Sequence, residues 1–171
     1  LTGTIPAGLA ELPLLTSFNV SGNPGLLVPL ANPAEREALI AFYDALGGDN
    51  WTNNTGWLGE AGTECNWFGI TCSSARHISE IRLSTVVNSN WVGNNLSGTL
   101  PVELGDLKKL KNLTLPYNNI SGSLPTTIGD LADLEVLHLA RNQLTGTLPD
   151  DLWGLTKLRQ LYLAENQFQG Q

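Results

Sequence analysis

Leucines and asparagines recur with a fixed spacing along the second half of the chain. Two sets of residues each keep an interval of 24 positions: Leu113, Leu137 and Leu161, and Asn118, Asn142 and Asn166. Each unit has the pattern L-x-x-L-x-x-L-x-L-x-x-N-x-L-x-G-x-L-P, as in residues 107–125 and 131–149, and a third unit begins at Leu155. A period of this length is typical of a solenoid, in which each unit packs only against its neighbours.

Each unit combines a short apolar pair with a polar turn. The L-x-L pair predicts a strand with two leucines on one face and the middle residue facing solvent. Because one such strand cannot bury its apolar face alone, neighbouring units must stack their leucines into a continuous core. A buried Asn can satisfy the backbone groups of the tight turn, while Gly tolerates positive φ and Pro needs no donor. The pattern therefore predicts a leucine-rich-repeat solenoid.

The segment after each Asn specifies a subclass of this repeat. A G-x-L-P element occurs at residues 98–101, 122–125 and 146–149, and it resembles the plant-type, extracellular subclass of leucine-rich repeats. The resemblance covers nearly the whole chain. It implies an α/β repeat solenoid, a right-handed superhelix with a parallel concave sheet, in which a second short strand follows each Asn turn.

Residues 33–83 do not repeat. Asn32, Pro33 and Gly47 bracket an apolar-periodic run and predict a helix with Asn as its N-cap and Gly just past its end. A Trp-rich loop follows, and then the segment Cys65–Cys72 (CNWFGITC), which is similar to the N-terminal cap of plant-type repeat proteins. The resemblance implies that a helix and a disulfide between these two cysteines cover the exposed end of the solenoid.

Three parts are predicted: a single repeat over residues 1–30, the cap with its first strand over residues 31–83, and the repeats of 24-residue period over residues 84–171. The first part is out of place, because a cap begins an array. Residues 1–30 close a preceding array, belong to a permuted unit, or dock on the C-terminal repeat of another copy. Such docking is a heterologous contact that builds filaments unless it closes into a ring. Since Leu1 falls inside a repeat, we expect a mature or excised segment.

One repeat is longer than the others. The first strand of the array ends at Leu83, but its Asn is Asn94, eleven residues later rather than three. Eight extra residues within Thr85–Gly93 (TVVNSNWVG) are therefore expected to project from the solenoid, and such loops often bind ligands. Trp91 is either an exposed anchor for a partner or a side chain that folds back onto the cap.

The concave sheet is the predicted binding surface, because its strands display the residues between and beside the buried leucines. Together with the insertion it supplies these ligand-binding candidates: Arg82, Trp91, Thr114, Tyr117, His138, Arg141, Gln160, Tyr162 and Glu165. Arg and Tyr offer large contact areas with hydrogen-bonding tips. The mixed charge favours a protein or glycan partner over a polyanion. The alternative is an ordinary solvated sheet without a ligand, since four strands make a small surface.

Six N-x-S/T sequons point to a secreted or cell-surface protein. Their asparagines are candidates for N-glycosylation: Asn19, Asn50, Asn53, Asn95, Asn112 and Asn119. An Asn-rich repeat also produces sequons by chance, so the extracellular interpretation depends on the cap and its cysteines as well. A glycan on Asn112 would obstruct the concave face.

Composition excludes several classes of protein. The 171 residues include 9 Lys and Arg against 16 Asp and Glu, a net charge of −7, which argues against a nucleic-acid partner. With 42% hydrophobic and 15% charged residues, the sequence is not that of a disordered acidic chain. No apolar run approaches the roughly 18 residues that a membrane span needs.

No catalytic or metal-binding constellation is evident. His77 and His138 lack an adjacent nucleophile motif, and Gly47–Asn50 lacks the ligand series of a phosphate or calcium loop. A metal site at Cys65, Cys72 and His77 would not have the cysteine spacing of zinc sites. We therefore expect no enzyme activity and no cofactor.

The resemblance implies an extracellular, non-catalytic recognition module, as in receptor ectodomains or inhibitors of cell-wall-degrading enzymes. The alternative is a structural or adhesive unit that self-associates head to tail.

Overall fold

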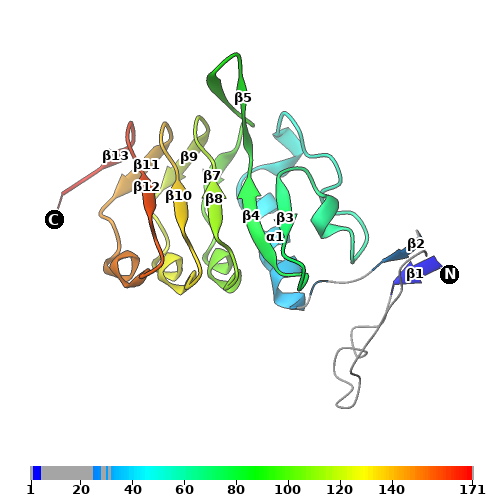
Figure 1. Cartoon of the computed structure of the whole chain (residues 1–171). Helices are drawn as coiled ribbons and strands as arrows, with labels where there is room; N and C mark the ends of the chain where they lie inside the picture. The colour runs from blue at the N-terminus through cyan, green and yellow to red at the C-terminus, as the bar shows by residue number, and fades with distance from the viewer. Residues whose placement is uncertain (1, 5–24, 28–29, 31, 171) are drawn as a thin grey trace.

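The computed structural model describes residues 2–4, 25–27, 30 and 32–170, and it shows a solenoid of stacked turns that begins at an N-terminal cap (Figure 1). Regular turns combine a strand of one sheet, a strand of a second sheet and a short 3-10 helix. The turns lie side by side, so equivalent residues of successive repeats form rows across the molecule. The predicted leucine-rich-repeat solenoid with its parallel sheet is confirmed.

A five-stranded sheet lines one side of the solenoid, and its outward surface is the concave face predicted above. Its strands, in spatial order, are β12 (Gln160–Tyr162), β10 (Val136–His138), β8 (Asn112–Thr114), β4 (Ile78–Arg82) and β3 (Ile70–Cys72). Neighbouring strands are parallel except β3 and β4, which pair antiparallel. The register places Leu113 between Ile81 and Leu137, so the inward-facing side chains stack directly.

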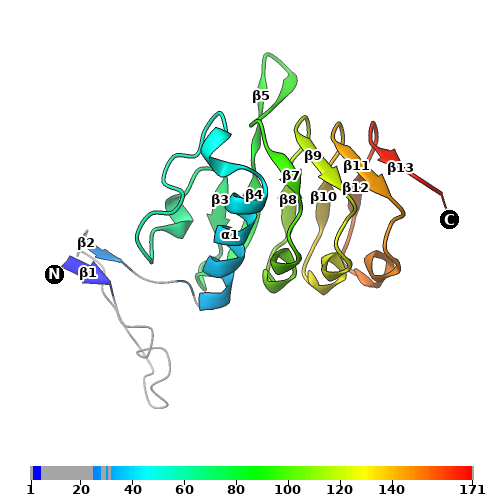
Figure 2. The same ribbon diagram turned by 180° about the vertical axis from the view of Figure 1, so that it is seen from behind.

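A second sheet runs along the other side of the same turns (Figure 2). Its parallel strands, in spatial order, are β13 (Gln167–Phe168), β11 (Gln143–Gly146), β9 (Asn119–Gly122) and β7 (Ser97–Thr99). The 3-10 helices that complete the turns are η4 (Val102–Asp106), η5 (Thr126–Asp130) and η6 (Asp150–Gly154). Leucine and isoleucine side chains fill the interior, and Leu113, Leu115, Leu137 and Leu139 are fully buried.

The repeated Asn bonds only to backbone, and it is buried at Asn118 and Asn142, as predicted, but half-buried at Asn166. The Asn118 Oδ1 accepts hydrogen bonds from the backbone N–H groups of Asn94 (2.9 Å) and Leu96 (3.0 Å) in the preceding turn. Its Nδ2 donates to the carbonyl oxygens of Leu115 (3.0 Å) and Pro116 (3.1 Å) in its own turn. One side chain therefore satisfies four backbone groups and ties two consecutive turns together.

The cap begins with α1 (Pro33–Ala45), whose N-cap Asn32 accepts a hydrogen bond from the Ala34 N–H at 3.1 Å. Gly47 adopts a left-handed φ of 66° just past the helix, as predicted. The 3-10 helices η2 (Gly48–Asn50) and η3 (Glu64–Asn66) follow. Three buried Trp side chains from this region pack on α1 and on one another: Trp51, Trp57 and Trp67.

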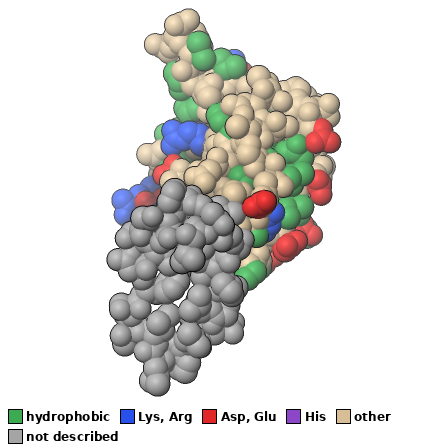
Figure 3. Space-filling model, turned by 90° about the vertical axis from the view of Figure 1, so that its right-hand side faces the viewer, with side chains coloured by type: hydrophobic (Ala, Val, Ile, Leu, Met, Phe, Trp, Pro, Cys, Tyr) green, Lys and Arg blue, Asp and Glu red, His purple; other side chains and the backbone are tan. Residues whose placement is uncertain are grey.

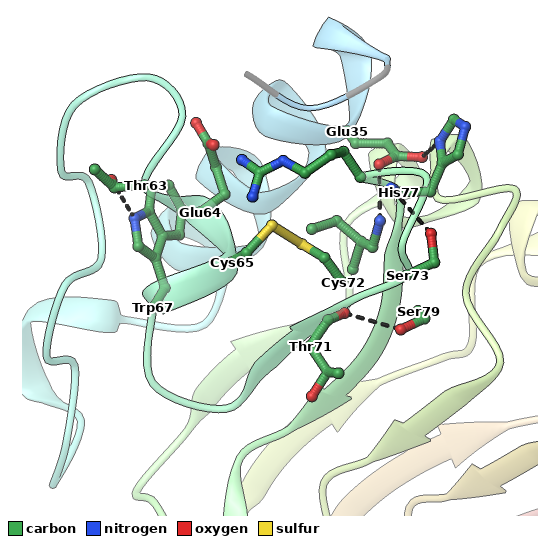
Figure 4. Close-up of a disulfide and its surroundings, with 12 residues drawn as sticks. Glu35, Thr63, Glu64, Cys65, Trp67, Thr71, Cys72, Ser73, His77 and Ser79 are labelled. Carbon is green, nitrogen blue, oxygen red and sulfur yellow. Dashed lines mark hydrogen bonds and ion pairs between the residues drawn. A yellow bond between two sulfur atoms is a disulfide. The ribbon is translucent and has the colours of Figure 1, made fainter. Parts of the chain in front are cut away.

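The predicted disulfide joins Cys65 and Cys72 and staples η3 to β3 (Figure 4). Glu35 of α1 lies in the surroundings of this disulfide (Figure 4). Its carboxylate is buried, since the residue is only 1% exposed. Its oxygens accept hydrogen bonds from the Ile78 N–H at 2.9 Å and contact His77 Nδ1 at 2.8 Å. These contacts fix α1 against the first strand of the array.

The insertion forms a β-hairpin that projects from the solenoid (Figure 1). Strands β5 (Ser84–Val87) and β6 (Asn90–Gly93) pair antiparallel. The two turn residues, Asn88 and Ser89, have φ of 49° and 67°, and positive φ at both positions matches the right-handed twist of the strands. The extra residues predicted within Thr85–Gly93 are thus a compact element of the fold.

The N-terminal part is described only in two short strands, β1 (Thr2–Thr4) and β2 (Gly25–Leu27), which pair in parallel. The repeat predicted over residues 1–30 lies largely outside the described residues. Its three alternative interpretations therefore stay predictions.

An ion-pair ladder links three successive repeats. Asp133 is bound by Lys109 at 3.2 Å and by Lys157, each 24 positions away. Hydrogen bonds from Lys157 and then Lys109 lower the pKa of the Asp133 carboxyl below its usual value. The lysines are more than half exposed, so each pair contributes about 0.2–1 kcal/mol at most.

Replacing Asn118, whose side chain bonds two consecutive turns, is expected to destabilise the whole array. Asn118→Ala removes four hydrogen bonds to buried backbone groups, of which only the Leu115 carbonyl oxygen keeps another partner, the Asn142 Nδ2 at 3.1 Å. We expect a loss of about 3–5 kcal/mol in the free energy of unfolding. Urea denaturation of unglycosylated protein measures this loss in the free energy of unfolding. The adjacent, exposed Asn119 provides the matched control, and Asn119→Ala should cost less than about 0.5 kcal/mol. Equal losses in the two variants would contradict the role assigned to Asn118.

Candidate functional site

The concave face presents the predicted row of side chains. Register pairs align Arg82, Thr114, His138 and Tyr162 across β4, β8, β10 and β12. A neighbouring row on the same face contains Glu80, Asn112, Val136 and Gln160. Arg82 is 55% exposed and lies 3.8 Å from the Glu80 carboxylate, so it remains accessible to a ligand.

Three aromatic rings form a continuous row across the concave face. Trp91 of the hairpin packs edge-on against His138, with ring centroids 5.3 Å apart. His138 in turn packs against Tyr162 at 4.8 Å. We call Trp91, His138 and Tyr162 the aromatic row. The alternative that Trp91 folds back onto the cap is wrong, because its ring lies on β10 of the array instead.

Thr114 does not offer its side chain to a ligand, contrary to the sequence prediction. It is 5% exposed, although its register position points outward between Arg82 and His138. Strand β8 lies between β4 and β10, so the hairpin side chain Trp91 crosses β8 to reach His138. The insertion therefore reaches across the concave face as far as β10.

A second row of large side chains runs parallel to the first. Tyr117, Arg141 and Glu165 are all exposed, and we call them the polar row. The Arg141 guanidinium lies 4.7 Å from the Tyr117 ring centre and bonds to Glu165 at 2.7 Å. Their φ angles are 59°, 58° and 57°, a conformation that costs an L-residue about 1–2 kcal/mol relative to glycine. The array thus holds three large side chains where glycine would be more relaxed.

Small side chains separate the two rows. Three small residues each follow a residue of the concave-face row Thr114, His138 and Tyr162 by two positions, and so face the same side of the strands: Pro116, Ala140 and Ala164. Ser84 begins β5 at the equivalent place, and its hydroxyl is buried with no hydrogen-bond partner in the described part of the chain. The two rows of large side chains therefore flank a strip of small ones. Alternate-position analysis of the sequence could have found this strip, whereas nothing in it indicated the Trp91–His138 contact.

Charge and apolar surface are unevenly distributed over the molecule. In the end-on view of Figure 3, most Lys and Arg side chains in sight lie on one side and most Asp and Glu on the other. The hairpin projects at the top of this view and carries hydrophobic side chains; Val86, Val87 and Val92 are 46–57% exposed.

The sequons fall on different surfaces. Asn50, Asn95 and Asn119 are exposed, while Asn53 and Asn112 are half-buried. Asn19 lies outside the described residues. Asn112 is on the concave face, as predicted.

Neither a metal centre nor a membrane span is found within the described residues. No group of three or more His, Cys, Asp or Glu side chains there is arranged to hold a metal ion. None of the helices described is long and apolar enough to cross a bilayer.

Two family models match the chain. The leucine rich repeat model covers residues 108–168, and the leucine rich repeat N-terminal domain model covers residues 32–73. The chain therefore contains leucine-rich repeats preceded by a leucine-rich-repeat N-terminal domain. The second match falls on α1, the Trp cluster and the disulfide, which form the cap. A comparison with curated proteins finds no match.

Solved structures with the same fold include ectodomains of plant receptors. The crystal structure of PEPR1–AtPEP1 is 31% identical with a TM-score of 0.69, over 80% of this chain and 18% of that one. The leucine-rich-repeat ectodomain of GASSHO1/SCHENGEN3 from Arabidopsis thaliana is 25% identical (TM-score 0.63, 78% of this chain and 15% of that one). That of SOBIR1 from Arabidopsis thaliana is 23% identical (TM-score 0.62, 82% and 71%) and shows the fold alone. The chain thus spans under a fifth of PEPR1.

The aromatic row should make stability depend on pH. Burial lowers the pKa of His138, so the unfolded chain takes up this proton first as the pH falls. The folded state then loses stability below about pH 6.5, until the lower folded-state pKa is reached. His138→Phe keeps a ring but cannot titrate, and the fall in its urea midpoint between pH 7 and pH 5 should be smaller than in the parent protein. An unchanged fall would contradict this account.

Proposed function

We propose that this protein is an extracellular, non-catalytic recognition module that binds a peptide or protein segment across its concave face. The observation that carries the proposal is the strip of small residues flanked by the aromatic row and the polar row. An extended segment lying on the strip would contact rings on one side and charged side chains on the other. Aromatic and Arg side chains are the residues that most often dominate binding energy.

The strained backbone of the polar row supports this use of the surface. Three successive repeats hold Tyr117, Arg141 and Glu165 in the left-handed region at a cost to stability. Stability alone would favour glycine there. Retention of large side chains at these positions is consistent with selection for contacts to a partner. The pairing of Arg141 with Glu165 and Tyr117 also fixes the guanidinium before a ligand arrives, which reduces the entropy lost on binding.

The related structures agree with a protein partner. The ectodomain of the plant membrane receptor kinase GASSHO1/SCHENGEN3 is in complex with CASPARIAN STRIP INTEGRITY FACTOR 2. An extracellular setting for this chain also fits its cap disulfide, since structural disulfides persist in oxidising compartments. The mixed charge of Arg82, Glu80, Arg141 and Glu165 favours a peptide with both signs of charge over a polyanion. A glycan is the competing ligand.

Selection from a random peptide display library, with a glycan array in parallel, tests the proposal. Peptides that bind the parent protein should bind at least about tenfold more weakly, or about 1.4 kcal/mol, to Trp91→Ala and to Tyr162→Ala. Trp153 is a matched control, because it is 65% exposed on η6, away from the concave face. Arg141→Gly should weaken binding without lowering the free energy of unfolding, since it relieves strain. Failure to enrich peptides, or equal effects of Trp91→Ala and Trp153→Ala, would refute the proposal.

Head-to-tail self-association is the second candidate function. Leu161 is 37% exposed on β12, whereas Leu113 and Leu137 in the same row are fully buried, so an apolar position is available on this strand. A mass by light scattering that rises with concentration and falls on dilution is the expected result. A constant monomer mass over the whole dilution series would exclude docking by residues 1–30.

A further inference from the structure

The outer face of the second sheet differs chemically from the concave face and from the surface formed by the 3-10 helices. The segments that form it contain no Asp, Glu, Lys, Arg or His: residues 94–101, 118–125, 142–149 and 166–170. The concave face carries Arg82, Glu80 and Arg141, and the 3-10 helices carry Asp106 and Asp130. An uncharged polar face in a chain of net charge −7 calls for its own explanation.

Alternation from Asn95 into β7, and along β9, puts the polar side chains of this face outward. Leu96 and Ile120 are fully buried, while Asn95, Ser97 and Asn119 are exposed. Asn95 and Ser97 are the first and third residues of one sequon, and Asn119 begins the equivalent sequon of the next turn. Both sequons therefore face solvent at the same place in consecutive turns.

Amide side chains connect these turns in a row. The Asn95 Nδ2 donates to the Asn50 carbonyl oxygen at 2.9 Å, and the Asn119 Nδ2 lies 3.5 Å from the Asn95 Oδ1. Gln143 donates to the Asn119 Oδ1 at 3.3 Å. An Asn amide has two N–H groups, and the Nδ2 of Asn95 and of Asn119 each donates to one acceptor. One N–H of each side chain therefore remains for a covalent bond to a sugar while the other keeps its hydrogen bond.

We propose that Asn95 and Asn119 are N-glycosylated and that their glycans cover the outer face of the second sheet. The occupant is then the chain's own oligosaccharide, a neutral chain rich in hydroxyl groups. Ser121 and Thr145 continue the row of Ser97 through the next turns, and hydroxyl side chains can both donate to and accept from sugar hydroxyls. Absence of charge suits this partner, because no buried charge is left unpaired beneath it.

Asn112 offers the opposite environment. It lies within β8 between Glu80 and Val136 of the concave face. It is half-buried, and the Thr114 of its sequon is 5% exposed. A glycan there would have to displace the side chains that cover Asn112 and Thr114. We therefore place Asn112 among the unmodified sequons, which leaves the concave face and the hairpin free.

Secretion of the full chain from cultured human cells behind a signal peptide provides the test. Enzymatic release of the glycans in 18O-water marks each occupied Asn by mass, and peptide mapping locates the marks. Ser97→Ala and Ser121→Ala each remove a sequon but keep its Asn, and each should lower the intact mass by one glycan. Thr145→Ala is the matched control, since it changes the equivalent position of the next turn, where no sequon exists. Protein retained in the cells is mapped in the same way, so poor secretion of a variant does not prevent the measurement.

The expected result is more than half occupancy at both Asn95 and Asn119 and less than that at Asn112. Less than half occupancy at Asn95 or Asn119 would overturn the proposal, and so would predominant occupancy of Asn112. This measurement uses no ligand, so its outcome does not depend on peptide binding by the concave face.

Discussion

Hydrogen bonding by one buried amide in each turn determines the geometry of this solenoid. Asn118 completes the backbone of its own turn and of the turn before it, and Asn142 repeats the arrangement by bonding to Ile120 and Leu139. Each amide therefore faces equivalent backbone groups of the turn before it. Asn94 extends the ladder differently: its side chain bonds both the N–H and the carbonyl of Asn53. The cap is thereby joined to the array by the same interaction that joins the repeats.

Features that depend on neighbouring sequence were predictable, and those that depend on distant contacts were not. Periodicity specified the sheets and the buried asparagines, because each repeat meets the same local environment. The helix limits followed from Asn32, Pro33 and Gly47, whose capping preferences are local. Resemblance to the family gave the Cys65–Cys72 pair. The sequence did not predict that Trp91 would reach β10, since that contact joins an irregular insertion to a strand two positions across the sheet.

The array separates its surfaces by chemistry. Rings and paired charges gather on the concave face, where Arg141 is fixed by Tyr117 and Glu165. The second sheet presents neutral hydroxyl and amide groups, and acidic residues occupy the 3-10 helices. Because equivalent positions of successive repeats form rows, a single type of residue repeated every 24 positions gives a whole surface its character. Such surfaces can differ sharply although they share one short sequence pattern.

The β5–β6 hairpin leaves the solenoid after Leu83 and returns before Asn94, so it begins and ends between two fixed points of the framework. Its length adds nothing to the pitch of the array, and the leucines on either side remain fully buried. Loops of other lengths and sequences should therefore be exchangeable at this junction. The position is therefore suited to loop grafting: a different hairpin would present different side chains beside the concave face while the solenoid stays the same.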